Sequence, residues 1–402
     1  MKKVQKVLGR RGTLFFLVVI SAFPPFTTDL YLPALPQMVE IFNTDHTMVN
    51  LTLSVYFLMY AFGLLFWGPL SDKYGRKPIM LIGIGIYVIA SLLCAASGSI
   101  ELLIGYRLIQ AFGGSAVTVV ATAIVKDLYD GREREKIMAT ILSLVIIAPM
   151  VAPVLGAFLL KIASWSMMFV ALAVFGLASA GLAMLYEETL EKRYTGSLLQ
   201  SWGRLAIVIK NPRFISLLCI FSIGPMAMMA FLSAGSYIYI DGFGLTEQQF
   251  SYFFAFNAFC AAFGPTIYMR LTKSFLVPSI ITFFYAMLAV CGLCTYTFGH
   301  MSPWVFACIA APATIAIIGV RVPGTNLMLN QQEEDTGSAV ALIQFFAMIC
   351  GSIGMVLATL NPEALIESLG IIQFLIGIIS CGLWLIVKKR DYVVNKIPSL
   401  TE

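Results

Sequence analysis

Long apolar stretches separated by short polar ones dominate the pattern along the chain. Twelve of them come close to the ~20 residues that a helix needs to cross the hydrocarbon core of a bilayer. They lie roughly at 14–36, 49–70, 79–98, 101–124, 137–160, 165–186, 213–240, 248–271, 277–299, 303–329, 337–360 and 366–387. Backbone polar groups have no water partner in that core, so these stretches must be helices. The runs are uniformly apolar rather than alternating, which argues against a membrane barrel.

Composition supports the same fold class. Of the 402 residues, 59% are hydrophobic and only 12% are charged, whereas soluble domains usually carry about 25% charged residues. A soluble fold would expose much of this apolar surface to water and would aggregate. The sequence therefore predicts an all-α polytopic membrane protein with twelve transmembrane helices.

Basic residues fall almost entirely on one side of these spans. With an even number of spans both termini share a side, and that side holds 23 of the 26 Lys and Arg residues. The opposite side holds only Lys161, and Arg107 and Arg321 lie inside spans. Basic loops stay in the cytoplasm, so we expect both termini on the cytoplasmic side of a cell membrane. The net charge of +5 reflects this bias and does not indicate a nucleic-acid partner.

A polar, charged segment divides the chain into two halves of six spans each. We expect an N-terminal bundle over 1–186, a cytoplasmic linker over 187–212 and a C-terminal bundle over 213–402. Short matches recur at the same place in each half, which favours parallel repeats of the kind found in two-half transporters. They are Phe66-Trp67-Gly68-Pro69 with Ala262-Phe263-Gly264-Pro265, and Gly105-Tyr106-Arg107 with Gly319-Val320-Arg321.

The loop at 68–78 carries the most specific motif. Gly68 allows backbones to approach closely at a helix end, and Gly75 permits a tight turn. Asp72 can accept hydrogen bonds at the N-terminus of a neighbouring helix, and Arg76 can pair with acids. An ordinary basic connector is the alternative. The order Gly-x-Leu-Ser-Asp-Lys-Tyr-Gly-Arg-Lys resembles the helix 2–3 signature of the major facilitator superfamily. The resemblance implies a cytoplasmic latch with Asp72 and Arg76 as its latch residues.

Arg107 and Gln110 lie in the fourth span with Gly113-Gly114, and Arg107, Gln110, Ala111 and Gly114 share one face of it. An arginine inside a span costs about 2.5–3.5 kcal/mol on insertion scales, and such residues mark pathways or charge pairs. The segment resembles the superfamily's Arg-x-x-Gln-Gly motif, with Ala111 in place of the glycine. The resemblance implies proton-coupled transport. A purely structural tie between helices is the alternative.

Asp29 is the only acid inside the first span. Its segment, Asp-Leu-Tyr-Leu-Pro-Ala-Leu-Pro, resembles helix 1 of the bicyclomycin/chloramphenicol-resistance subfamily. The resemblance implies that Asp29 carries protons or senses cations. Pro33 and Pro36 mark a helix end, so an exposed, inert Asp29 at that end is the alternative. Some relatives carry a second acid earlier in the helix, where this chain has Ser21-Ala22-Phe23.

The fifth span has small residues every four positions, at Ala148, Ala152 and Gly156, which suits close helix packing. Pro149 and Pro153 each remove a backbone donor and bend a helix. The segment resembles the antiporter motif of drug/proton exporters, with Ala157 in place of the final glycine. The resemblance implies a bent helix that seals a cytoplasmic leak path. Simple packing is the alternative.

Together these motifs favour a monomeric drug/proton antiporter, in which two bundles rock about a central site and export small drug-like amphipathic compounds. Protons are the coupling ion, and no other cofactor or metal is expected. A nutrient importer is the main alternative. A lipid or isoprenoid transferase using Asp127-x-x-Asp130 would need a second acidic motif, and ATP-driven transport a phosphate loop, and the sequence has neither. Candidate cavity-lining residues are Tyr31, Tyr56, Phe231, Tyr237, Asn257 and Arg321.

Overall fold

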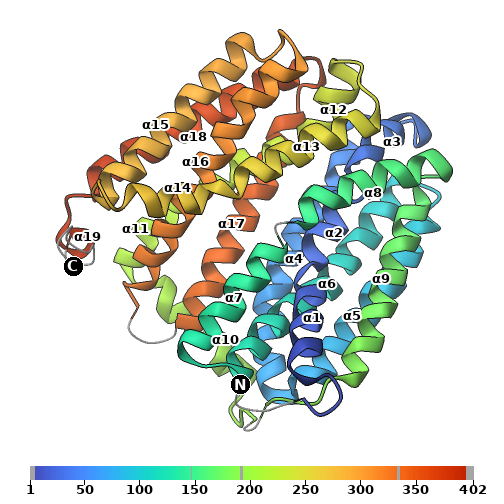
Figure 1. Ribbon diagram of the computed structural model, residues 1–402, viewed down its shortest axis with the longest axis vertical. Helices are drawn as coiled ribbons and strands as arrows, with labels where there is room; N and C mark the ends of the chain where they lie inside the picture. The colour runs from blue at the N-terminus through green and yellow to red at the C-terminus, as the bar shows by residue number, and fades with distance from the viewer. Residues whose placement is uncertain (1–4, 146, 191–192, 333–335, 395–402) are drawn as a thin grey trace. The chain divides into compact units, whose positions relative to one another are not determined.

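The computed structural model describes residues 5–145, 147–190, 193–332 and 336–394, and the regular elements in these ranges are helices (Figure 1). The chain forms two compact units, Met1–Trp202 and Gly203–Glu402. The boundary between them lies inside the segment 187–212, so the start of the predicted linker belongs to the first unit and its end to the second.

The first unit contains nine α-helices, a 3-10 turn and the start of a tenth helix among the described residues. They are α1 (Gly9–Ser21), α2 (Phe23–Asp29), η1 (Leu32–Ala34), α3 (Leu35–Ile41), α4 (His46–Tyr74), α5 (Arg76–Ala95), α6 (Ile100–Leu128), α7 (Gly131–Val145), α8 (Ala148–Ile162), α9 (Ser166–Leu185) and α10 (Leu198–Ile209), which crosses into the second unit.

The described part of the second unit continues with α11 (Pro212–Phe221), α12 (Gly224–Tyr237), the π-helical turn η2 (Ile238–Gly242), α13 (Glu247–Ala261), α14 (Phe263–Leu271), α15 (Val277–Phe298), α16 (Pro303–Leu329), α17 (Thr336–Thr359), the 3-10 turn η3 (Pro362–Ala364), α18 (Leu365–Val387) and α19 (Asp391–Val394).

Eleven helices or helical runs in the described residues are long and apolar enough to cross a membrane. The predicted fifth span, 137–160, falls on α7 and α8, and α8 is a shorter apolar helix of 15 residues. Large apolar side chains on the outside of the units confirm that lipid rather than water is the solvent. Ile89 is 63% exposed, whereas Arg107 is fully buried.

Side-chain caps explain where several long helices begin. Asp45 accepts a hydrogen bond of 2.7 Å from the backbone N–H of Met48 at the start of α4. Ser99 and Ser302 cap α6 and α16 in the same way, and Thr246 with Gln249 forms a capping box at α13. Such caps satisfy N–H groups that the first turn of a helix leaves without partners.

The first membrane-length run of each unit is broken, and prolines explain the breaks. Gly9–Ile41 consists of α1, α2, η1 and α3, with Pro24 and Pro25 at the start of α2. Pro212–Gly242 is divided between α11 and α12, and α12 begins with Gly224-Pro225. Proline lacks an N–H and is tolerated in a first turn, so it favours a new helix start over a continued one.

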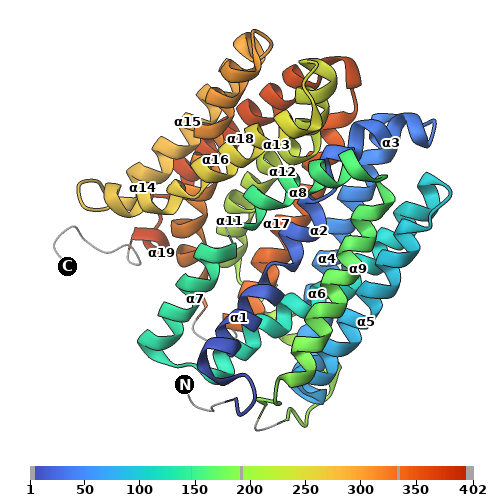
Figure 2. The ribbon, with the colours of Figure 1, turned by 45° about the vertical axis from the view of Figure 1, so that its right-hand side comes forward.

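Small residues allow helices to approach closely within each unit. A Cβ at Gly113 on α6 would stand 2.7 Å from the carbonyl oxygen of Gly83 on α5. In the second unit, a Cβ at Gly292 on α15 would stand 2.3 Å from the backbone nitrogen of Phe374 on α18. Both views show α15 and α18 side by side along their lengths (Figures 1 and 2). Packing of this kind holds helices together where lipid supplies no hydrophobic drive.

Candidate functional site

Arg107 lies on α6 and is fully buried in the first unit. Its Nε donates to the carbonyl oxygen of Thr52 on α4 at 3.2 Å. Its Nη1 donates to Gln110 Oε1 at 2.6 Å and to the carbonyl oxygen of Thr27 on α2 at 3.4 Å. Arg107 therefore joins three helices through uncharged acceptors.

Aromatic rings surround the same guanidinium. The Cζ atom of Arg107 lies 4.2 Å from the ring centre of Tyr56, 4.7 Å from that of Tyr31 and 5.8 Å from that of Phe169. A desolvated cation over an aromatic face gains about 2 kcal/mol. Within the described residues Arg107 forms no ion pair, and its Nη2 has no hydrogen-bond partner. The rings and carbonyls thus hold a positive charge that pairs with no carboxylate in the part of the chain that the structure describes.

Gln110 extends this cluster to α5. Its Nε2 donates to Ser91 Oγ at 2.7 Å, while its Oε1 accepts from Arg107. The hydroxyl of Tyr87, also on α5, lies 2.7 Å from Thr27 Oγ1. The predicted face of α6 therefore points into a polar cluster that α2, α4, α5 and α6 share.

Asp29 is the last residue of α2 and is 5% exposed. The exposed, inert position at a helix end is therefore not the one that the structure shows. Thr28 Oγ1 donates to Asp29 Oδ1 at 2.9 Å. In the described residues Asp29 has no ion pair, although Thr27, two positions earlier, accepts from Arg107. The buried cation of α6 thus bonds to the backbone of α2 without pairing with the buried acid at the end of α2.

The helix α8 lies against this segment. Gly156 lies in close contact with it, because a Cβ there would stand 1.8 Å from the carbonyl oxygen of Leu30. Ala148, Ala152 and Gly156 are all buried, as a packing face requires. Pro149 is the second residue of α8 and stands in its first turn, and Pro153 lies inside the helix. The expected bend of a continuous helix at Pro149 is replaced by a helix start.

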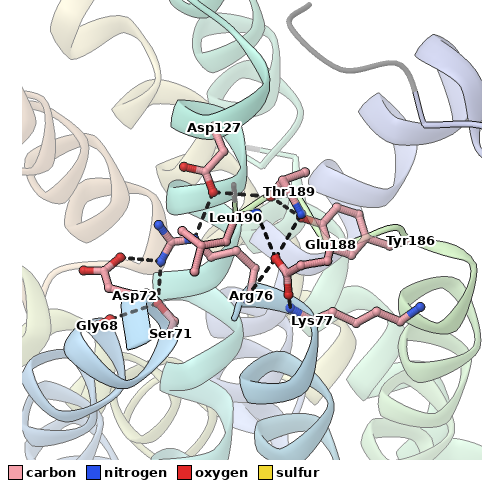
Figure 3. A network of polar contacts seen from close by, with 10 residues as sticks. All are labelled: Gly68, Ser71, Asp72, Arg76, Lys77, Asp127, Tyr186, Glu188, Thr189 and Leu190. Carbon is pink, nitrogen blue, oxygen red and sulfur yellow. Dashed lines mark hydrogen bonds and ion pairs between the residues drawn. The ribbon is translucent and has the colours of Figure 1, made fainter. Parts of the chain in front are cut away.

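The loop at 68–78 forms a charged network at the end of α4 (Figure 3). Arg76 Nη1 donates to Asp72 Oδ1 at 2.6 Å and to Ser71 Oγ at 2.8 Å. Its Nε donates to Asp127 Oδ2, at the end of α6, at 2.9 Å. The side chain of Asp72 is 56% exposed, while that of Asp127 is 17% exposed. Solvent screens exposed pairs, so the pair with Asp127 contributes more to holding Arg76.

The chain matches the Major Facilitator Superfamily over residues 14–395. It belongs to that superfamily. An uncharacterised transporter of the superfamily from Bacillus subtilis, YdgK, is 30% identical over 393 residues, which cover 95% of this chain and 96% of that protein. A bicyclomycin resistance protein homologue from Haemophilus influenzae is 31% identical over 276 residues, or 65% of this chain and 67% of that protein.

A solved transporter structure shows that the major facilitator fold extends over the chain. A bacterial homologue of the human lysosomal transporter Spinster aligns with a TM-score of 0.77 over 96% of this chain and 98% of that one, at 14% identity. The family prediction is therefore confirmed, and the protein is a multi-pass membrane transporter rather than an enzyme.

Glu188, which lies outside the loop at 68–78, also belongs to the network in Figure 3. Glu188 Oε1 accepts from the backbone N–H groups of Arg76 at 3.1 Å, Thr189 at 2.9 Å and Leu190 at 3.0 Å, and its Oε2 accepts from that of Lys77 at 3.1 Å. Glu188 lies in the predicted linker. At the N-terminus of α5 the acidic acceptor is therefore Glu188, while Asp72 binds the side chain of Arg76.

The remaining predicted residues lie at varied depths. Tyr31, Tyr56 and Tyr237 are buried, and Asn257 is 5% exposed. Phe231 stacks on Phe254 and Phe306 with ring centres 6.3 and 6.2 Å apart. Arg321, on α16, is exposed. The structure thus joins Tyr31 and Tyr56 to the Arg107 cluster and places the other four within the second unit.

Sequence reasoning missed several residues that the structure places beside the predicted ones. Asp127, Glu188 and Thr189 belong to the loop network, and Ser91 to the Arg107 cluster. A small hollow of about 140 Å³ also opens in the first unit, lined by Ser21, Thr118, Ala121, Thr122, Val125, Met138, Ile141 and Val145. Of these residues, only the acids Asp127 and Glu188 could have been found from the sequence, since an acid at a helix end beside a basic loop is a recognisable signal.

Proposed function

We propose that this protein is a secondary active efflux transporter, which exports small amphipathic compounds in exchange for protons by alternating access. We further propose twelve membrane-spanning helices, with α7 and α8 together making one of them, and cytoplasmic termini in the bacterial inner membrane. Membership of the superfamily and a relative named for bicyclomycin resistance support export of such compounds. The strong bias of basic residues toward one side supports the orientation.

The buried carboxyl of Asp29 carries the proposal. It lies well inside the membrane-length run Gly9–Ile41, whereas the other described acids in such runs stand near an end. Acids in this position mark proton relays in transporters. The group has a hydroxyl donor in Thr28 and, within the described residues, no cation paired with it. Such a group is suited to bind and release a proton as its surroundings change.

The chemistry of the neighbouring groups supports Asp29 as the proton carrier. Arginine stays protonated in proteins, so Arg107 cannot carry a proton across. Gln110 is neutral and does not titrate. Arg107, on α6, instead places a fixed positive charge beside α2, the helix that carries Asp29, through its bond to the carbonyl oxygen of Thr27. We assign Asp29 as the proton carrier, and Arg107 and Gln110 as the groups that position its helix.

Replacing Asp29 with asparagine tests this assignment. Asn keeps the size and the acceptor oxygen but cannot exchange a proton. In inverted vesicles we expect Asp29→Asn to abolish proton release on addition of chloramphenicol and to abolish accumulation against a gradient. Exchange of labelled for unlabelled compound, which needs no net proton movement, should persist.

Glu40→Gln is the matched control. Glu40 lies in the same run, near its end, and its side chain is exposed. It should keep proton-coupled accumulation. If Asp29→Asn, expressed at the normal level, accumulated chloramphenicol as well as the parent protein, Asp29 would not be the proton carrier. A susceptibility panel in an efflux-deficient host, with and without an uncoupler, then ranks the substrates, and protection that survives the uncoupler would argue against proton coupling.

A further inference from the structure

The start of the linker between the two units is tied to the loop at 68–78. Glu188 accepts four backbone N–H groups, two from the first turn of α5 and two from the residues that follow it in the chain. The charge sits at the positive end of the α5 dipole, where an anion is favoured. One side chain therefore fastens residues 188–190 and the N-terminus of α5 to the same point.

The backbone at Gly75 is shaped for this contact. Gly75 has φ 114° and ψ 155°, which non-glycine residues avoid. A Cβ there would also stand 2.6 Å from Glu188 Oε2. The glycine of the loop motif thus leaves the space in which the Glu188 carboxylate reaches α5.

Further bonds fix the linker segment around Glu188. Thr189 Oγ1 donates to Asp127 Oδ2 at 3.3 Å, on the same oxygen that accepts from Arg76. The hydroxyl of Tyr186 lies 2.5 Å from Thr189 Oγ1. Burial raises the pKa of Tyr186, so that hydroxyl stays protonated and able to donate. The linker therefore meets both partners of the buried ion pair.

The start of α5 also bonds to the end of α9. Lys77 Nζ donates to the carbonyl oxygen of Met184 at 2.7 Å, in the last turn of α9. Cations are favoured at a helix C-terminus as anions are at an N-terminus. Glu188 at the start of α5 and Lys77 at the end of α9 thus place one charge at each of two helix ends.

We propose that Glu188 is a positioning residue of the cytoplasmic loop. It holds the first turn of α5 so that the guanidinium of Arg76 reaches Asp127, and it thereby makes the start of the linker part of the loop's charged network. A substitution at Glu188 therefore affects the position of Arg76 and that of the linker together. The transport consequence rests on the proposed function, whereas the positioning itself does not.

Hydrogen exchange of the purified protein tests the positioning directly. In Glu188→Gln, we expect the backbone amides of Arg76, Lys77, Thr189 and Leu190 to exchange about tenfold faster or more, since each loses a bond to a charged acceptor. Exchange at the end of α6, around Asp127, should also rise, because Arg76 no longer holds it. Glu187→Gln is the matched control, since the described contacts of Glu187 are those of its backbone with Gln5.

Glu188→Asp separates positioning from a local turn. Asp keeps the charge and can still accept from the two residues after it, but it is shorter by about 1.5 Å and does not reach α5. We expect protection to return at Thr189 and Leu190 only. Full recovery at α5 and α6, or no rise in exchange at the end of α6 in Glu188→Gln, would overturn the proposal. Both exchange results are measured on variant protein that remains monodisperse, so that misfolding does not explain them.

Transport measures what the positioning does. We expect Glu188→Gln to lower the maximal rate of chloramphenicol export about tenfold while the KM changes less than about twofold. Combined with Asp127→Asn it should be no worse than Asp127→Asn alone, because both act through Arg76. Fully additive losses would refute a shared route. A parent protein that exports no compound would refute the proposed function, and the exchange results would still decide the role of Glu188.

Discussion

Substituting Gly156 by alanine tests how α8 is coupled to the segment that carries Asp29. The added Cβ would stand 1.8 Å from the carbonyl oxygen of Leu30 and 2.9 Å from its carbon. Leu30 follows Asp29 directly in the chain. The blocking atoms are backbone atoms, which cannot rotate away as a flexible side chain would. Either α8 or the end of α2 must therefore retreat by more than about 1 Å.

The energy of that shift can be set against the gain from alanine in a helix. Overpacking a close contact costs about 1–3 kcal/mol. Alanine in a helix interior is favoured over glycine by about 0.5–1 kcal/mol. The overpacking cost exceeds this gain because the added carbon meets backbone atoms. We expect Gly156→Ala to lower the melting temperature by several degrees, at roughly 2–4 °C per kcal/mol for a unit of this size.

The melting temperature is measured by thermal unfolding in detergent, with the reactivity of the buried thiols as the readout. Gly181→Ala is the matched control, because Gly181 lies inside α9 with nothing within 4 Å of the added carbon. It should leave the melting temperature unchanged or raise it slightly. Proton-coupled export should fall in Gly156→Ala and persist in Gly181→Ala, since only the former moves the residue next to Asp29.

The outcome that would refute this reasoning is simple to recognise. If Gly156→Ala matched the parent protein in both melting temperature and proton-coupled export, α8 would not lie against Leu30 as described. A loss of stability with normal coupling would keep the packing and refute the link to Asp29. A larger residue at the same place, as in Gly156→Val, should worsen both properties in order of size.

Three further predictions address other parts of the chain. Arg107→Lys keeps the charge but loses the planar contacts with three rings and at least one hydrogen bond. We expect the free energy of unfolding to fall by about 2 kcal/mol. An unchanged melting temperature in thermal unfolding would contradict this expectation. Arg76→Lys replaces a planar fork, whose Nε reaches Asp127 and whose Nη1 reaches Asp72, with a single nitrogen. Initial rates of export should therefore fall while KM stays within about twofold. A raised KM at a normal rate would count against the latch. Gly292→Ala should destabilise the second unit by about 1–3 kcal/mol. Hydrogen exchange should become faster in α15 and α18 and stay unchanged in the first unit. Equal effects on both units would argue against a local clash.

The residues predicted from motifs differ in how well local pattern could place them. Arg107 and Gln110 lie on one face of α6 and are both fully buried, as the helical spacing implies. The spacing could not show that aromatic rings and carbonyls, rather than an acid, would surround Arg107. That outcome depends on which side chains α2, α4 and α9 bring to the same depth.

The first and fifth predicted spans illustrate a second limit. Prolines in the first span predict a helix end near Pro33, and the structure has α2 end at Asp29 and the 3-10 turn η1 stand between α2 and α3. In the fifth span the same reasoning predicts a bend at Pro149, and the structure begins a helix there instead. A proline sets its own φ and removes one donor, but whether a helix bends or restarts depends on what packs beside it.

Short stretches of sequence were enough to establish the solvent, the helices, the orientation signal and the superfamily. These follow from local properties, because apolar run length, basic loops and a contiguous motif can be read within about 20 residues. The partners of the charges, by contrast, depend on tertiary packing. Arg76 meets Asp127 across 51 positions of sequence, and its backbone meets Glu188 across 112. Hydrogen bonds require donor and acceptor within about 3 Å, and only the packing of α4, α5, α6 and the linker brings such distant residues that close.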